Sequence, residues 1–193
     1  MDSAVQENSI TESVASVAEL GGEAMALMKP EMHPLDFVAK LMEKQFYPDA
    51  VRFVAHALPK REAVWWAWMS ARRGSGENAP PKIKASLEAT EKWIAQPTDE
   101  NCREAKAAAE IAQLGTAAGC AGLAAFFAGD SLAPPDCPAV PPGPYLTAKA
   151  VTGAVIFAAM SGDPNQAPEK FKSFVAQGVD VTKRLKLWEG KQA

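Results

Sequence analysis

The chain has 193 residues, of which 48% are hydrophobic and 22% are charged, and its formal net charge is −3. These values are ordinary for one soluble globular domain. A slightly acidic chain has no electrostatic basis for binding nucleic acid or an anionic membrane surface. No run of residues reaches the roughly 18–20 apolar positions that a membrane-spanning helix needs. The composition therefore predicts a folded domain that neither inserts into membranes nor binds nucleic acid.

The cysteines and the N-terminal residues bear on the compartment. Cys102, Cys120 and Cys137 are odd in number and widely spaced, which fits neither a disulfide framework nor a zinc-binding pattern. The first twenty residues are acidic and lack the apolar segment of a secretory signal. We therefore expect a reducing environment, with the cytoplasm as the simplest case.

In chain order, the pattern is that of successive short helices. Residues 1–9 are expected to be disordered, and a first helix then runs until Gly21–Gly22 stops it. The apolar residues of this helix share one face and are Ile10, Val14, Val17 and Leu20. Later helices are expected to begin, mostly at a proline or a capping threonine, near residues 34, 48, 60, 80, 98, 116, 147 and 164. Gly178 is expected to divide the last helical region from a terminal turn.

No segment alternates apolar and polar residues with β-branched enrichment, so the predicted fold class is all-α. The breaks between helices are short, which implies antiparallel neighbours. We therefore predict seven to nine short helices packed as antiparallel hairpins, in an irregular bundle or a short solenoid-like array. They form a single domain over residues 10–188, with disorder at 189–193.

The central stretch of the chain, Tyr47–Arg73, reads YPDAVRFVAHALPKREAVWWAWMSARR. Pro48 suits the first turn of one helix, and Pro59 ends that helix and starts the next. Trp65 and Trp66 of the second helix fall outside its main apolar arc, which leaves two interpretations.

One interpretation buries Trp65 and Trp66 under neighbouring helices. The other exposes them in a partner-binding surface with Arg72 and Arg73, because tryptophan and arginine are enriched at binding hot spots. Trp68, four residues before Arg72, is also placed for a cation–π contact.

Two nearly uncharged helices flank a proline-rich segment. Thr116–Gly129 carries no charge and predicts a central buried helix, and a second such helix runs from a cap at Thr147 to about Met160. Asp130–Pro144 between them has six prolines in fifteen residues, so it is expected to be an extended loop near polyproline II. This loop either covers the uncharged helices or serves as a docking strand. In the docking interpretation the candidate contact residues are Pro134, Pro135, Pro141 and Pro142.

Catalytic and cofactor motifs are absent from the sequence. Neither His33 nor His56 lies in a metal-binding motif, and there is no phosphate-binding glycine loop or nucleophile elbow. We therefore predict no metal, no cofactor and no catalytic residue. The alternative is a pocket between the uncharged helices, reached past His56, Arg61 and Glu62.

Two segments, AVRFVAHALPKREAVWWAW and GDSLAPPDCPAVPPGPYLTAKAV, give the chain a family resemblance. From about Gly22 onward the chain resembles an uncharacterised bacterial helical family, a domain of unknown function. That resemblance implies an association with gene neighbourhoods of the type VI secretion system and its effector-loading adaptors. It brings no catalytic residues with it.

The leading functional hypothesis is a non-enzymatic cytoplasmic interaction protein, an adaptor, chaperone or accessory protein that holds another protein. The resemblance makes a secretion cargo or its adaptor the suspected partner. A small-molecule-binding domain or cryptic enzyme is the alternative. An immunity-type inhibitor of a toxin is a third candidate, although such inhibitors more often show a strongly charged face, which this sequence lacks.

Overall fold

The computed structural model describes residues 9–189, which form ten α-helices and one short 3-10 helix and contain no strand. The elements are α1 (Ile10–Val17), α2 (Gly22–Met25), α3 (Pro34–Glu43), α4 (Tyr47–Ala57), α5 (Lys60–Ser75), α6 (Pro81–Ala95), α7 (Asp99–Ala112), α8 (Ala117–Ala128), α9 (Leu146–Met160), η1 (Pro164–Gln166) and α10 (Ala167–Arg184). The all-α prediction is confirmed, with one α-helix more than the predicted maximum of nine. The disorder predicted at the two ends concerns residues 1–8 and 190–193, which lie outside the described part of the chain, and Ser9 and Glu189 at its borders.

Prolines and threonines set most of the helix starts. Pro48 lies in the first turn of α4, and Pro59 is the N-cap of α5. The side chains of Thr98 and Thr116 accept hydrogen bonds from backbone N–H groups in the first turns of α7 and α8. Such a cap gives a partner to an N–H group that has none within the helix. The predicted starts near 34, 48, 60, 80, 98, 116 and 147 lie within one residue of those of α3 to α9.

The first helix buries a different face from the predicted one. Ile10 is 51% exposed, whereas Thr11 and Ala15, one position on, are buried. The Thr11 hydroxyl donates a hydrogen bond to the backbone oxygen of Met32, so this polar residue is satisfied in its inner position. Val14, Val17 and Leu20 of the predicted face are only partly buried, so the buried face is displaced by about one position from the one that the apolar spacing predicted.

Three predicted helix boundaries are wrong. The first helix ends at Val17, before Gly21–Gly22, and Glu19 with φ 52° turns the chain. Thr147 is not a cap but the second residue of α9, where its hydroxyl is buried without a hydrogen-bond partner in the described chain. Gly178 does not divide the last region, because α10 continues through it.

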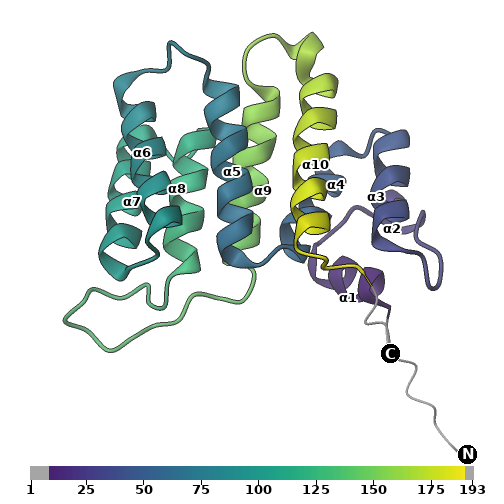
Figure 1. The fold of residues 1–193 in the computed structure, drawn as a ribbon, viewed down its shortest axis with the longest axis horizontal. Coiled ribbons are helices and arrows are strands. Elements are labelled where there is room, and N and C mark those ends of the chain that lie inside the picture. The colour runs from purple at the N-terminus through teal and green to yellow at the C-terminus, as the bar shows by residue number, and fades with distance from the viewer. Residues whose placement is uncertain (1–8, 190–193) are drawn as a thin grey trace, which may run out of the picture.

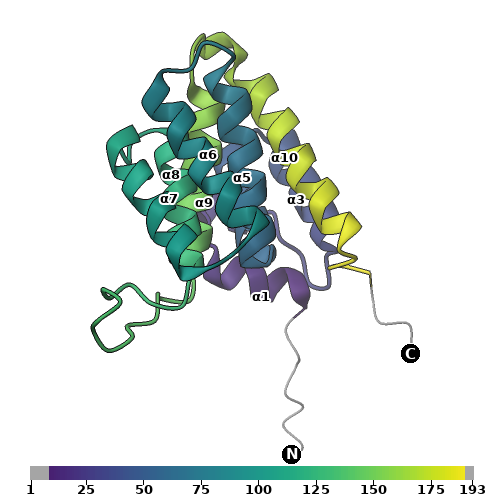
Figure 2. The same cartoon turned by 60° about the vertical axis from the view of Figure 1, so that its left-hand side comes forward.

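The helices from α5 to α10 form the predicted succession of antiparallel neighbours (Figure 1). Each packs against the next along the chain, and the contact between α8 and α9 is the most extensive. The exception is α4, which packs on α9 and α10 rather than on α5. As a result α5 and α9 lie in the middle, between a group formed by α6, α7 and α8 and a group formed by α3, α4 and α10 (Figures 1 and 2).

The core between the central helices consists largely of alanine. Five alanines of α8 and α9 are completely buried, namely Ala121, Ala124, Ala125, Ala154 and Ala158. At Gly74, a Cβ atom would lie 2.9 Å from the backbone and side chain of Ala158, so α5 and α9 approach as closely as their backbones allow. Small side chains are what permits this spacing.

Candidate functional site

The four residues proposed on α5 do not form one surface. Trp66 is completely buried, and its indole N–H donates to the backbone oxygen of Phe174 on α10 at 2.8 Å. Trp65 is half-buried. Trp66 therefore contributes to the packing of α5 against α10, as a buried indole with a satisfied N–H does, and the partner-surface interpretation is wrong for it.

Arg72 and Arg73 do lie at the surface of α5, and each is held by an aromatic ring. The guanidinium of Arg72 lies 5.3 Å from the ring centre of Trp68, which is the predicted cation–π contact. Arg73 lies 5.9 Å from the ring of Phe174 and donates to the hydroxyl of Ser173 at 2.8 Å. Such contacts fix the guanidinium groups in position.

These arginines line a groove of about 910 Å³ between α5 and α6, with one residue from α10. We call it the α5–α6 groove. It includes three cationic and three anionic side chains, namely Arg72, Arg73, Lys84, Glu77, Glu88 and Glu91. None of the six makes an ion pair within residues 9–189. The groove thus offers charge of both signs around an apolar wall that includes Trp68 and Leu87.

The second predicted element, the proline loop (Asp130–Pro144), projects from the end of the molecule where α8 ends and α9 begins (Figures 1 and 2). Pro134, Pro135 and Pro141 are exposed, Pro142 is half-buried, and Val140 is 52% exposed. The loop does not cover the uncharged helices, so the shielding interpretation is wrong.

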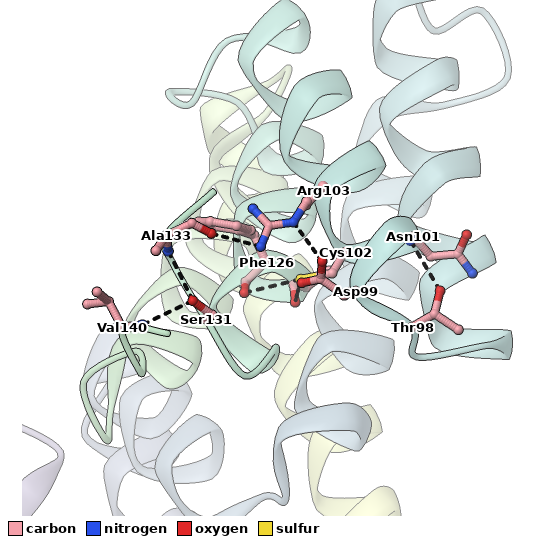
Figure 3. Close-up of polar contacts among 10 residues, drawn as sticks. Thr98, Asp99, Asn101, Cys102, Arg103, Phe126, Ser131, Ala133 and Val140 are labelled. Carbon is pink, nitrogen blue, oxygen red and sulfur yellow. Dashed lines mark hydrogen bonds and ion pairs between the residues drawn. The ribbon is translucent and has the colours of Figure 1, made fainter. Parts of the chain in front are cut away.

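Hydrogen bonds fix the base of the proline loop in spite of its exposure (Figure 3). The hydroxyl of Ser131 accepts from the backbone N–H groups of Ala133 and Val140, at 3.1 and 3.0 Å. The backbone N–H of Leu132 also donates to the oxygen of Val140 at 2.8 Å. The outgoing and returning segments of the loop are therefore joined to each other at the base.

One contact ties this base to the helical bundle (Figure 3). Arg103 on α7 donates through one nitrogen to the backbone oxygen of Ala133, at 2.8 Å. Its Nε donates to the carboxylate of Asp99 at 2.7 Å, one helical turn earlier. Because the carboxylate orients the guanidinium, the loop is held from a rigid helix rather than from another loop.

Residues 37–182 match DUF6931, a family of unknown function. The chain belongs to the DUF6931 family. No curated protein and no solved structure matches it. The DUF6931 match covers α3 from Phe37 through most of α10, and therefore both the α5–α6 groove and the proline loop.

The alternative pocket of this DUF6931 protein is not built as predicted. Arg61 donates to the backbone oxygens of Ile94 and Ala95, at 2.8 and 3.4 Å, and so caps the end of α6. His56 Nδ1 donates to the backbone oxygen of Arg52 at 2.8 Å. Neither residue, nor Glu62, lines the α5–α6 groove. Arg61 thus bonds to the end of α6 and His56 to a backbone oxygen of its own helix, while Glu62 is half-buried on α5.

The cysteines and His33 have structural positions. Burial raises the pKa of the Cys102 and Cys120 thiols above their ordinary value, which makes them poor nucleophiles. Cys137 is exposed in the proline loop. His33 caps α3 by accepting from the backbone N–H of Leu35 at 3.2 Å.

Across residues 9–189, no group of three or more His, Cys, Asp or Glu is placed to hold a metal ion, and no helix is long and apolar enough to cross a membrane.

Sequence reasoning missed the residues that anchor the loop and the second wall of the groove. The spacing of Asp99 and Arg103 indicates an ion pair on one helix, but nothing local marks the bond from Arg103 to Ala133, which lies 30 residues away. Nor does local sequence indicate that Ser131 bonds to Val140 nine residues later. A signal did exist for the groove wall, since Lys84, Glu88 and Glu91 share one face of α6 at helical spacing. A charged stripe of this kind usually indicates only a solvated face.

Proposed function

We propose that this protein is a non-enzymatic protein-interaction module, with the proline loop as its main contact element. The observation that carries the proposal is the combination of exposure and fixed geometry in that loop. Ordering a segment costs conformational entropy, about 1–2 kcal/mol per residue for the backbone alone. Residues 134–141 of the loop are exposed, so they regain little of that cost by packing within their own chain.

The loop's composition supports the same conclusion. Its prolines restrict the unfolded chain, so less entropy is lost when the loop adopts one conformation. Exposed Val140 and the exposed pyrrolidine rings add apolar surface at the projecting end. An element that is preorganised, apolar and accessible binds a partner protein without a further ordering cost.

We place the adaptor, chaperone or accessory role, the cytoplasm and effector loading for type VI secretion within this proposal as its specific form. This form depends on the resemblance of the two quoted segments and on the scattered cysteines. It makes a secretion cargo or its adaptor the expected partner.

The test compares capture of protein partners from a native host lysate by three forms of the tagged full chain. The first is wild type, and the second carries a Gly/Ser segment of equal length in place of residues 134–142. The third is a control in which the exposed Lys172–Glu169 ion pair is reversed, by Lys172→Glu with Glu169→Lys, on α10 at the other side of the molecule from the loop (Figure 1). We expect wild type and the reversed pair to retain the same stoichiometric partner and the loop replacement to lose it.

Two results would contradict the proposal. One is equal capture by the loop replacement and wild type, and the other is no stoichiometric partner for any form. Circular dichroism of all three forms establishes that the helical fold is intact, so that a loss of capture reports on the loop itself.

The α5–α6 groove favours the second candidate, a small-molecule-binding domain. Its six unpaired charged side chains would suit a ligand that carries charge of both signs. A thermal-shift screen with zwitterionic small molecules tests this. A rise in melting temperature that Arg73→Glu abolishes would support the groove as a site, and the absence of any rise would remove it.

A further inference from the structure

Four of the six prolines in the proline loop are spaced three residues apart, at Pro135, Pro138, Pro141 and Pro144. A polyproline II helix has three residues per turn. Residues at this spacing therefore share one edge of such a helix. All four are exposed.

The segment Pro138–Pro144 has almost no freedom to adopt another conformation. Proline fixes its own φ near that of polyproline II, and a residue that precedes proline is pushed into the extended region. Every residue of the segment except Ala139 is a proline or precedes one. One tight turn comes earlier, where the N–H of Cys137 donates to the oxygen of Pro134 at 3.0 Å. A second turn begins at Pro144, where the N–H of Leu146 donates to the oxygen of Gly143 at 3.2 Å, and residues 138–143 between the two contain no turn or bend.

The backbone of this segment is also available for recognition. The carbonyl oxygens of Pro138, Ala139 and Pro141 accept no hydrogen bond from any other described residue. The oxygen of Val140 does accept one, from the N–H of Leu132, and that bond holds the segment against the outgoing part of the loop. One edge thus carries proline rings, while free carbonyl groups stand beside them.

We propose that Pro138–Pro144 is a preformed polyproline II ligand for an aromatic-lined groove on a partner protein. This inference rests on the proposed interaction function and names the chemistry of the partner. Aromatic rings of such a groove pack against Pro138, Pro141 and Pro144, and its indole or phenol groups donate to the free carbonyls. Asp136, exposed two residues before the segment, selects a basic side chain beside the groove.

The experiment presents the full-length chain to a panel of immobilised domains that bind polyproline II segments, namely SH3, WW and EVH1 domains. Three forms of the chain are compared by surface plasmon resonance. Pro138→Ala with Pro141→Ala removes two rings from the shared edge. Pro134→Ala with Pro142→Ala is the matched control, because it removes the same number of prolines outside the three-residue spacing. All substitutions lie in the loop, and circular dichroism checks that each form is folded.

We expect at least one domain of the panel to bind wild type. Loss of the edge prolines should weaken that binding roughly tenfold or more, and the control pair should change it by less than about twofold. The proposal is overturned if no domain binds, or if the two double variants bind alike. The lysate experiment separates the two proposals: a partner captured through the loop without any binding to the panel overturns only the polyproline II inference.

Discussion

Gly178 illustrates how one residue sets the distance between two helices. Its Cβ, if present, would lie 2.8 Å from two ring carbons of Trp66 and from Cγ1 of Val54. The indole cannot move away, because it is completely buried and its N–H is bonded to Phe174. The glycine in α10 is therefore required by the tryptophan beneath it.

Gly178→Ala should destabilise the protein. Alanine is favoured over glycine within a helix by about 1 kcal/mol. Overpacking a well-filled core costs about 1–3 kcal/mol, and the contact distance puts this site toward the upper part of that range. We expect a net loss in the free energy of unfolding, measured by urea denaturation. Gly22→Ala is the control, since nothing lies within 4 Å of its Cβ position. Equal or greater stability of Gly178→Ala would show that α10 does not approach Trp66 this closely.

His56 gives the stability of the fold a pH dependence. Burial lowers its pKa below the ordinary value, although its hydrogen bond to the oxygen of Arg52 acts in the opposite direction. The second ring nitrogen, Nε2, is buried without a partner in the described chain, and the ring lies 5.8 Å from that of Tyr145. Protonation would place a charge there that the folded protein does not solvate.

The unfolded chain therefore takes up a proton at His56 at a higher pH than the folded protein does. As pH falls below the ordinary histidine pKa of about 6.5, unfolding becomes more favourable, and the loss continues until the folded-state pKa is passed. Above about pH 7 the contribution of His56 is constant. Urea denaturation at several pH values from 8 down to 5, on both sides of the ordinary histidine pKa of about 6.5, should show this decline in the free energy of unfolding. The decline should be smaller in His56→Gln, and an unchanged decline in that variant would assign the effect to other groups.

At the scale of elements, the two nearly uncharged helices, α8 and α9, form the most extensive helix–helix contact within residues 9–189. Ala154 on α9 is completely buried, as are Ala121, Ala124 and Ala125 on the facing helix α8. Each has only a methyl group, so the backbones are close and no space remains for a longer side chain.

Ala154→Leu should cost on the order of 1–3 kcal/mol in the free energy of unfolding, because three added carbon atoms must displace neighbouring helices. Ala107→Leu is the matched control, since Ala107 is an exposed residue of α7. Thermal denaturation of both variants measures the difference. A wild-type melting temperature for Ala154→Leu would mean that α9 is not packed in this core.

The elements that sequence predicted well are those determined by local chemistry. Pro48, Pro59 and Thr116 marked helix boundaries because a missing N–H or a capping hydroxyl acts within one helical turn. The Trp68–Arg72 contact followed from a spacing of four residues on one helix.

The side-chain positions that could not be predicted from the sequence depend on tertiary neighbours. Thr11 faces inward because a carbonyl of Met32 is there to accept its hydrogen bond. The same holds for the site: Arg103 holds Ala133 across thirty positions of sequence. Trp66 was placed outside the apolar arc of its helix, yet α10 covers it. The composition of the proline loop predicted its extended character, but its projection from the bundle depended on these distant contacts.

At the scale of the whole molecule, the helices differ in how many neighbours hold them. α9 packs against α4, α5, α8 and α10, whereas α1 contacts only α3 and α4 to a significant extent (Figure 1). Local opening of α1 therefore exposes little apolar surface. Opening of α9 requires that both groups of helices separate.

Hydrogen exchange followed by mass spectrometry should reveal this difference. Amides of α8 and α9 should exchange only through global unfolding, so their opening free energy should equal the value from urea denaturation. Amides of α1 and α2 should exchange with a much smaller opening free energy, because α1 exposes Ile10 and α2 has only four residues. Exchange of the same peptides in denaturant gives the rates of the unfolded chain, against which the protection of each helix is calculated. Equal protection of α1 and α9 would mean that the N-terminal helices unfold only with the rest of the domain. Early exchange of α9 would contradict its central place, since a helix held by neighbours on both sides cannot open before they do.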